Sequence, residues 1–119
     1  MKIVDRNTFL AMACPTFFAK ADRRNPILGE IQVKVGQLNS DFISIQIPDF
    51  EADDSSDFGQ KYRSLVAGVA LPLSVEESSR DGLFEGDEIM FCVLERGDLL
   101  LLREMVDEAI EAATRPAEA

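Results

Sequence analysis

Histidine and tryptophan are absent from this chain of 119 residues, and tyrosine occurs once. Histidine is the side chain that most often acts as a base at neutral pH, so its absence excludes nucleophilic catalysis by Ser-His or Cys-His pairs. Carbohydrate hydrolases use paired carboxylates, which the chain has in plenty, but it lacks the tryptophans that usually accompany them in sugar sites. These residue types favour a protein that is not an enzyme and has no catalytic residues.

Cysteine is scarce, and long hydrophobic runs are missing. Cys14 lies beside Pro15, Cys92 lies inside the run "IMFCVL", and their spacing fits neither a metal site nor a redox motif. No apolar run approaches the roughly 20 residues that span a bilayer, and the start "MKIVDRNTF" has no signal-peptide core. We therefore expect a reduced cytoplasmic protein with no cofactor, no metal and no membrane contact.

Basic residues are outnumbered, with 12 Lys and Arg against 22 Asp and Glu and a net charge of −10. Such a charge repels nucleic acids and anionic membranes, so direct nucleic-acid binding is not expected. The local basic group Lys20, Arg23 and Arg24 is typical of a solvated turn. The acidic excess favours the surface of a basic protein as the partner.

The first half of the chain predicts a short helix followed by strands. Asp5 is a candidate N-cap for a helical turn that Pro15 prevents from extending, and "TFFAKA" has the composition of a strand. In "EIQVKVGQ" the apolar Ile31, Val33 and Val35 alternate with polar residues, which predicts a strand with one wet face that includes Lys34. "DFISIQIP" repeats this pattern, and "GQLNS" between them predicts an antiparallel hairpin.

The second half predicts two longer helices around one more strand. Asp54 and Ser55 are candidate caps for a helix that carries Phe58, Tyr62 and Leu65 on one face and stops near Gly68. Residues 70–87 have no period and predict a loop. "EIMFCVLE" predicts a strand well inside the sheet, and Asp98 is a candidate cap for a final helix that docks on it.

Together these elements predict an α+β fold of about four mainly antiparallel strands with two main helices packed on one face. The length predicts a single domain over residues 1–115, followed by a frayed tail at 116–119. The stripe of the final helix consists of Leu99, Leu102, Met105, Val106, Ala109, Ile110 and Ala113.

Two groups of acids are the candidate partner-binding residues. The segment 53–64 resembles a calcium loop, but its sixth position is Phe58 instead of glycine and its twelfth is Ser64 instead of glutamate, so helix capping explains it better. Carboxylates in rows can also occupy a surface built for phosphates, and a solvated face that maintains solubility is the simpler interpretation. The predicted set is Asp49, Glu51, Asp53, Asp54 and Asp57, together with Glu85, Asp87 and Glu88.

The stretches "MKIVDRNTFLAM", "ILGEIQVKVG", "SDFISIQI" and "RDGLFEGDEIMFCVLERGDLLLLREMV" resemble a loose group of small proteins of tailed phages and prophages. The shared layout is an Asp-Arg opening, a Gly-Glu strand, an Asp-Phe strand, and an Arg-Asp-Gly turn before a terminal strand and helix. The resemblance implies a bacterial or phage cytoplasm and supplies no catalytic residues.

The hypothesis that follows is a non-enzymatic, phage-type accessory protein that acts by protein-protein binding. By analogy, it would inhibit a host defence complex or another complex that handles nucleic acids. One alternative is a small enzyme or ligand-binding domain that uses carboxylates of the acidic segment. The other is a structural module that assembles with its own copies through an exposed strand edge.

Overall fold

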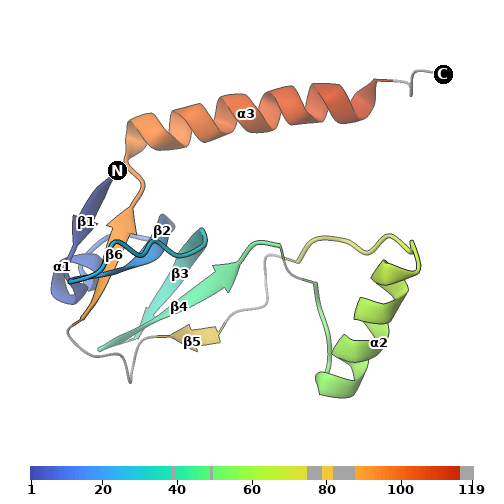
Figure 1. Ribbon diagram of the computed structural model, residues 1–119, viewed down its shortest axis with the longest axis horizontal. Helices are drawn as coiled ribbons and strands as arrows, with labels where there is room; N and C mark the ends of the chain where they lie inside the picture. The colour runs from blue at the N-terminus through green and yellow to red at the C-terminus, as the bar shows by residue number, and fades with distance from the viewer. Residues whose placement is uncertain (39, 49, 75–78, 82–87, 116–119) are drawn as a thin grey trace.

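A computed structural model describes residues 1–38, 40–48, 50–74, 79–81 and 88–115 (Figure 1). All neighbouring strands of its single sheet are antiparallel, in the order β1-β6-β2-β3-β4-β5. In chain order the elements are β1 (Lys2–Val4), α1 (Arg6–Leu10), β2 (Thr16–Asp22), β3 (Gln32–Leu38), β4 (Asp41–Gln46), α2 (Ser55–Val66), β5 (Ser79–Asp81), β6 (Ile89–Val93) and α3 (Arg96–Thr114).

The α+β class and the antiparallel sheet are confirmed, but the sheet has six strands instead of about four. The two additional strands, β1 and β5, are three residues long and form the edges of the sheet. β5 falls within residues 70–87, for which a loop was predicted, whereas 75–78 and 82–87 lie outside the described residues. β3 and β4 form the predicted hairpin, and β6 lies between β1 and β2.

Four buried phenylalanines form the centre of the core. Phe9 of α1 stacks on Phe91 of β6, with 4.2 Å between ring centroids, and meets Phe18 edge-on at 4.7 Å and Phe42 edge-on at 5.1 Å. Asp5 caps α1 as predicted, because its carboxylate accepts the Thr8 N–H at 2.8 Å. The short helix α1 is therefore the element that covers the aromatic core.

The ammonium of Lys34 is buried against the end of α1, which corrects its predicted place on a wet strand face. Lys34 has no exposed surface, and its Nζ donates to the backbone carbonyls of Phe9 at 3.0 Å, Leu10 at 3.1 Å and Met12 at 2.8 Å, and to Gln37 Oε1 at 2.8 Å. Burial lowers the pKa of this ammonium. The cation donates to carbonyls at the C-terminal end of this five-residue helix, where the Phe9 carbonyl also accepts the Met12 N–H at 3.1 Å.

A register shift between Lys34 and Gly36 explains why the predicted alternation fails there. An irregularity of this kind makes the strand bend and changes which side chains face the core. Lys34 pairs with Ser44, and both are buried, whereas Val35 is exposed. The prediction of a wet face for Lys34 and Ser44 was therefore wrong.

The prediction that two main helices pack on one face of the sheet is also wrong. Neither α2 nor α3 has a buried residue, and Figure 1 shows α2 beyond the end of β4 and α3 running away from the end of β6. The short helix α1, which carries Phe9, and the buried Lys34 already cover the aromatic core. Neither long helix is therefore required to shield it from water. The radius of gyration is 17.0 Å, whereas a compact domain of this length has roughly 13–14 Å.

The beginning of α3 also differs from the prediction. Glu95, not Asp98, is the N-cap, and Asp98 lies in the first turn, where its Oδ2 accepts the Glu95 N–H at 2.8 Å. The ammonium of Met1 lies 2.6 Å from the same carboxylate oxygen. These two contacts lower the pKa of Asp98. They join the start of α3 to β1.

Candidate protein-binding site

The predicted acidic set is not one surface. Glu51, Asp53, Asp54 and Asp57 lie together at the start of α2, whereas Glu88 lies beside β6. Three further predicted members, Asp49, Glu85 and Asp87, lie outside the described residues.

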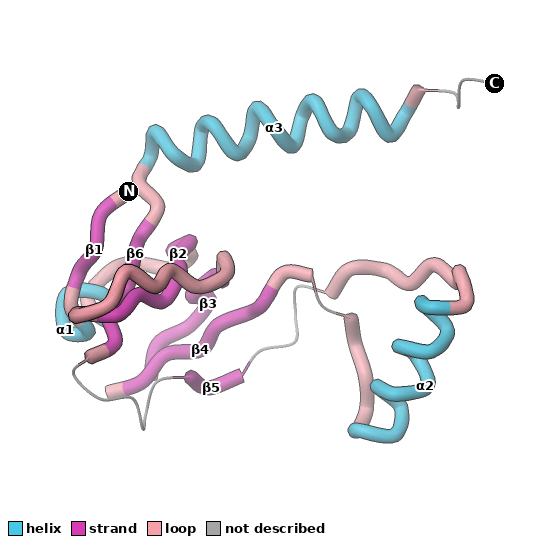
Figure 2. Tube along the Cα trace, in the orientation of Figure 1, coloured by secondary structure: helices cyan, strands magenta, loops and turns pink. Residues whose placement is uncertain are grey.

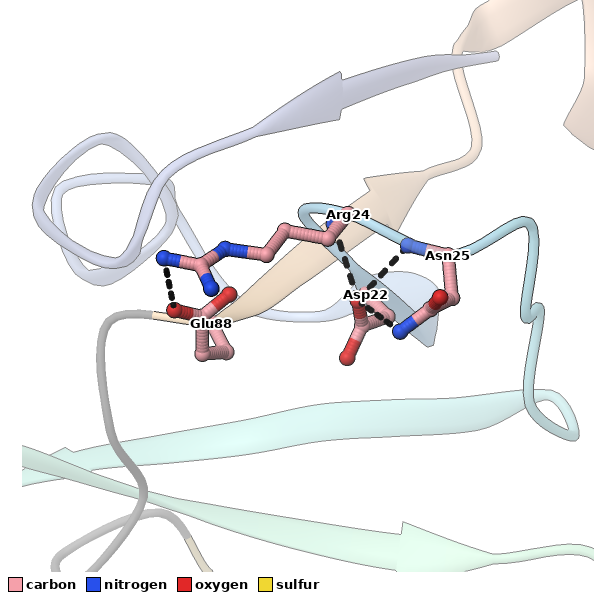
Figure 3. Close-up of polar contacts among 4 residues, drawn as sticks. All are labelled: Asp22, Arg24, Asn25 and Glu88. Carbon is pink, nitrogen blue, oxygen red and sulfur yellow. Dashed lines mark hydrogen bonds and ion pairs between the residues drawn. The ribbon is translucent and has the colours of Figure 1, made fainter.

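Glu88 belongs to a separate polar corner at the ends of β2 and β6 (Figure 3). Its Oε1 lies 3.2 Å from Arg24 Nη2, and its carbonyl accepts the Arg23 N–H at 2.7 Å. The Asp22 carboxylate accepts the N–H groups of Arg24 and Asn25, both at 2.8 Å, which lowers the pKa of Asp22. A local turn and one ion pair therefore fix the position of Glu88, which lies apart from the acids at the start of α2.

Two of the four acids near α2 stabilise the helix end, as the sequence predicted. Asp54 is the N-cap and accepts the Asp57 N–H at 2.8 Å. Asp57 in turn accepts the Asp53 N–H at 2.9 Å and lies 3.1 Å from Lys61 Nζ, which also donates to the Glu51 carbonyl at 2.7 Å. This network holds the acidic segment against α2 and leaves the side chains of Glu51 and Asp53 exposed.

The same network predicts that acid loosens α2. The Asp53 N–H and then Lys61 hold the pKa of Asp57 below its ordinary value of 3.8. The folded pKa is the lower one, so the stabilisation is complete above pH 3.8 and is lost as the pH falls through the folded pKa. Tyr62 in α2 is the sole tyrosine and the chain has no tryptophan, so its fluorescence reports on this helix.

We expect Tyr62 fluorescence and the helical circular dichroism signal to change together as acid is added. Asp57→Asn should lose part of this transition, because the amide neither titrates nor pairs with Lys61. The matched control is Asp107→Asn on the exposed part of α3, which should keep the wild-type titration. Superimposable curves for the wild type and Asp57→Asn would show that this network does not stabilise α2.

Beside α2 lies an apolar groove that the sequence analysis missed as a site. Its volume is about 410 Å³, and its walls come from one face of α2 and from the chain on both sides of the helix, which Figure 2 shows as loop. Phe50 stacks on Phe58 with 4.7 Å between ring centroids. The lining consists of Pro48, Phe50, Phe58, Tyr62, Leu65, Leu71, Pro72 and Leu73.

A second hollow of about 300 Å³ adjoins the apolar groove and is more polar. It shares Phe50 and the 71–73 segment with the groove and adds Glu51, Lys61 and Ser74. Glu51 supplies the one carboxylate among the lining residues of these two hollows. The converging acids that a carboxylate-based active site needs are therefore not found in this part of the described structure.

The described residues do not bring together three Cys, Asp or Glu side chains that could hold a metal ion. The segment 53–64, which resembles a calcium loop, is instead the capped start of α2. Within the described ranges, no helix combines the length and apolarity needed to cross a bilayer. Of the two cysteines, Cys92 is buried in the sheet as predicted, and Cys14 is exposed.

Comparison with protein-family models, with curated proteins and with solved structures finds no match to this chain. The resemblance to phage and prophage proteins therefore stays a prediction. The groove and the exposed helix faces are the features of the described structure that bear on function.

Proposed function

We propose that this protein acts without catalysis, by binding apolar segments of basic partner proteins in the apolar groove beside α2. The observation that carries the proposal is the groove itself, an open hollow of about 410 Å³ whose lining contains no charged side chain among the described residues. Grooves that accept an anchoring side chain of another protein have this chemistry.

The residues of the groove are those that favour protein interfaces. Tyr62 is 56% exposed and Phe58 is 45% exposed, although both are large and apolar over most of their surface. Aromatic residues are enriched at interfaces because a rigid ring buries a large area at little cost in conformational entropy. Leu65, Leu71 and Leu73 complete the lining of the groove, which an aliphatic or aromatic side chain of a partner would occupy.

The charge around the groove specifies the partner further. Glu51 lines the adjoining hollow, Asp53 follows two residues later, and the whole chain carries a net charge of −10. A lysine or arginine next to the anchoring side chain would meet this acidic rim at close range. The acids predicted from the sequence thus keep a role, as a rim that attracts basic partners and not as the main binding surface.

The bacterial or phage setting and the inhibition of a host complex have no support beyond the sequence resemblance. They remain predictions about which basic protein the groove receives. The binding chemistry can be tested without knowing that protein.

A library of random short peptides, displayed and selected on the immobilised protein, tests the proposal. We expect the enriched peptides to share an aromatic or aliphatic anchor flanked by Lys or Arg. Enriched peptides that lack Tyr and Trp can be titrated against the protein while Tyr62 fluorescence is followed. Their affinity should fall as salt is raised, because salt screens the attraction of the exposed acids.

Two groove variants and one control separate the apolar and charged contributions. Leu65→Ser should weaken binding about tenfold or more, as expected for an anchor contact. The double variant Glu51→Gln, Asp53→Asn should mainly reduce the salt dependence. Leu101→Ser on α3 is the control and should bind as the wild type does. The proposal fails if no peptide is enriched or if Leu65→Ser leaves the affinity of enriched peptides unchanged.

A further inference from the structure

Another exposed apolar surface in the described part of the molecule is a seam along α3. Leu99, Leu102, Val106, Ala109 and Ala113 follow one another at intervals of three, four, three and four residues. This is the spacing that helices use when they pack against one another over several turns. Met105 and Ile110, which are 56% and 59% exposed, flank the seam on its two sides. Below, "α3 seam" means these seven residues.

In the described part of the protein, most of the α3 seam is exposed. α3 has no buried residue along its 19 residues, and in Figure 1 it projects from the end of β6 without lying over the sheet. The opposite side of the helix carries Glu104, Asp107, Glu108 and Glu111. A helix with one apolar and one charged side, and with nothing packed on the apolar side, is built to meet another surface.

We propose that the α3 seam binds the α3 seam of a second copy of this chain, with the two helices antiparallel. This inference is independent of the groove beside α2 and of the function proposed for it.

The side chains fit an antiparallel register. With the symmetry axis near Glu104, Leu99 faces Ala109 of the second copy and Leu102 faces Val106 of the second copy. The symmetry repeats both contacts, so four layers form and each pairs a larger side chain with a smaller one. Such alternation lets two helices interdigitate at native packing density.

The charges favour the antiparallel arrangement over the parallel one. The acids are concentrated towards the end of α3, at Glu104, Asp107, Glu108 and Glu111, whereas Arg96 and Arg103 lie towards its start. The antiparallel arrangement keeps the acidic half of each α3 apart from the acidic half of the second copy and beside the half that carries Arg96 and Arg103. Parallel helices would put the two acidic ends side by side, where like charges repel. The helix dipoles point in opposite directions in the antiparallel pair, and this also favours the antiparallel arrangement.

The area of the α3 seam suits a weak pair. Leu99, Met105, Val106 and Ile110 are 36–59% exposed, so the seam offers on the order of 500 Å² per chain and a symmetric pair buries at most about 1,000 Å², near the lower limit for a biological interface. We therefore expect a reversible dimer whose population depends on protein concentration. Such a dimer carries two grooves, and a partner with two apolar segments would gain avidity from it.

Sedimentation velocity and light scattering over a concentration series test the dimer. The expected mass approaches twice the 13.2 kDa of one chain as concentration rises. Val106→Glu places a charge in the middle of the seam on both copies and should raise the dissociation constant at least about a hundredfold. Leu100→Glu is the matched control, because Leu100 lies on the same helix away from the seam, and it should dimerise as the wild type does.

Cysteine cross-linking tests the orientation, in a background where the exposed Cys14 is replaced by serine. A mixture of Leu99→Cys and Ala109→Cys chains should form a covalent dimer, since these positions face each other. Leu99→Cys alone should not, because its two copies lie several turns apart and a disulfide needs Cα atoms within about 7 Å.

Three results would overturn the inference. The first is a wild-type protein that stays monomeric at about 1 mM, where even weak pairs associate. The second is a dimer that Val106→Glu leaves intact while circular dichroism shows the same fold. The third is cross-linking of Leu99→Cys with itself, which indicates parallel helices. Leu65→Ser, which disables the groove, should dimerise normally, so a failure here is distinguishable from a failure of the proposed function.

Discussion

Lys34→Met is expected to lower the free energy of unfolding by at least about 3 kcal/mol, because it removes a buried ammonium that donates to three backbone carbonyls. The Phe9 carbonyl keeps the Met12 N–H, but the partly buried carbonyls of Leu10 and Met12 lose this donor. Lys34 donates to Phe9, Leu10 and Met12, and it is the residue through which β3 holds the end of α1. Methionine retains much of the side-chain volume but offers no N–H. A loss of this size is a large part of the roughly 5–15 kcal/mol that stabilises a typical domain.

Urea unfolding followed by circular dichroism measures this loss. Lys61→Met is the matched control, since Lys61 makes the same kinds of contact, a backbone carbonyl and one side chain, at the exposed start of α2. We expect the control to lose no more than about 1 kcal/mol. If the two variants lose similar amounts of unfolding free energy, the buried ammonium of Lys34 stabilises the fold no more than the exposed ammonium of Lys61 does.

The burial of Lys34 also shows where the sequence pattern stops being informative. The alternation in "EIQVKVGQ" correctly predicts β3, because a strand with two faces imposes a period of two on its own residues. It does not reveal the register shift between Lys34 and Gly36, which depends on how β3 pairs with β4. Gly36 within a strand pattern was the one local signal of an irregularity.

The starts of α1 and α2 were predictable from the sequence, whereas the packing of the apolar sides of the helices was not. Asp5 and Asp54 were predictable as caps, because capping involves residues within one turn. The apolar stripes of α2 and α3 were also predictable, but a stripe states only that a helix has an apolar side. Whether that side packs on its own sheet, forms a groove or meets a second copy depends on the rest of the chain, and here Phe9 already covers the core.

The apolar groove was hard to foresee for a related reason. Its walls come from α2 and from two segments on either side of it, at residues 48–50 and 71–73. The signal in the sequence was the presence of Pro, Phe and Leu just outside both ends of an amphipathic helix. The acidic residues between 51 and 57 are more conspicuous in the sequence, and they attract the prediction of a binding role that we propose for the neighbouring apolar residues.

Phe9→Ala is expected to cost about 3–5 kcal/mol, the largest effect of any single aromatic truncation in this protein. Phe9 is fully buried, and its ring lies 4.2–5.1 Å from the other three phenylalanines of the core, closer than the 5.7–5.9 Å that separates those three from one another. α1 has five residues and cannot be stable by itself, so the ring is its anchor. Phe58→Ala is the control, because Phe58 is 45% exposed and stacks on Phe50 alone among the ring pairs described, and it should cost about 1 kcal/mol.

The two predicted losses should not add, because Phe9 and Lys34 act on the same helix. A milder change, Phe9→Leu, loosens α1 and lets its carbonyls reach water, so the loss of the Lys34 ammonium matters less afterwards. The double variant Phe9→Leu, Lys34→Met should therefore lose less stability than the sum of its single variants, by more than the roughly 0.5 kcal/mol within which independent sites add. Strict additivity would mean that Phe9 packs in the core without holding α1 in place for Lys34, and the two sites would then stabilise the fold independently.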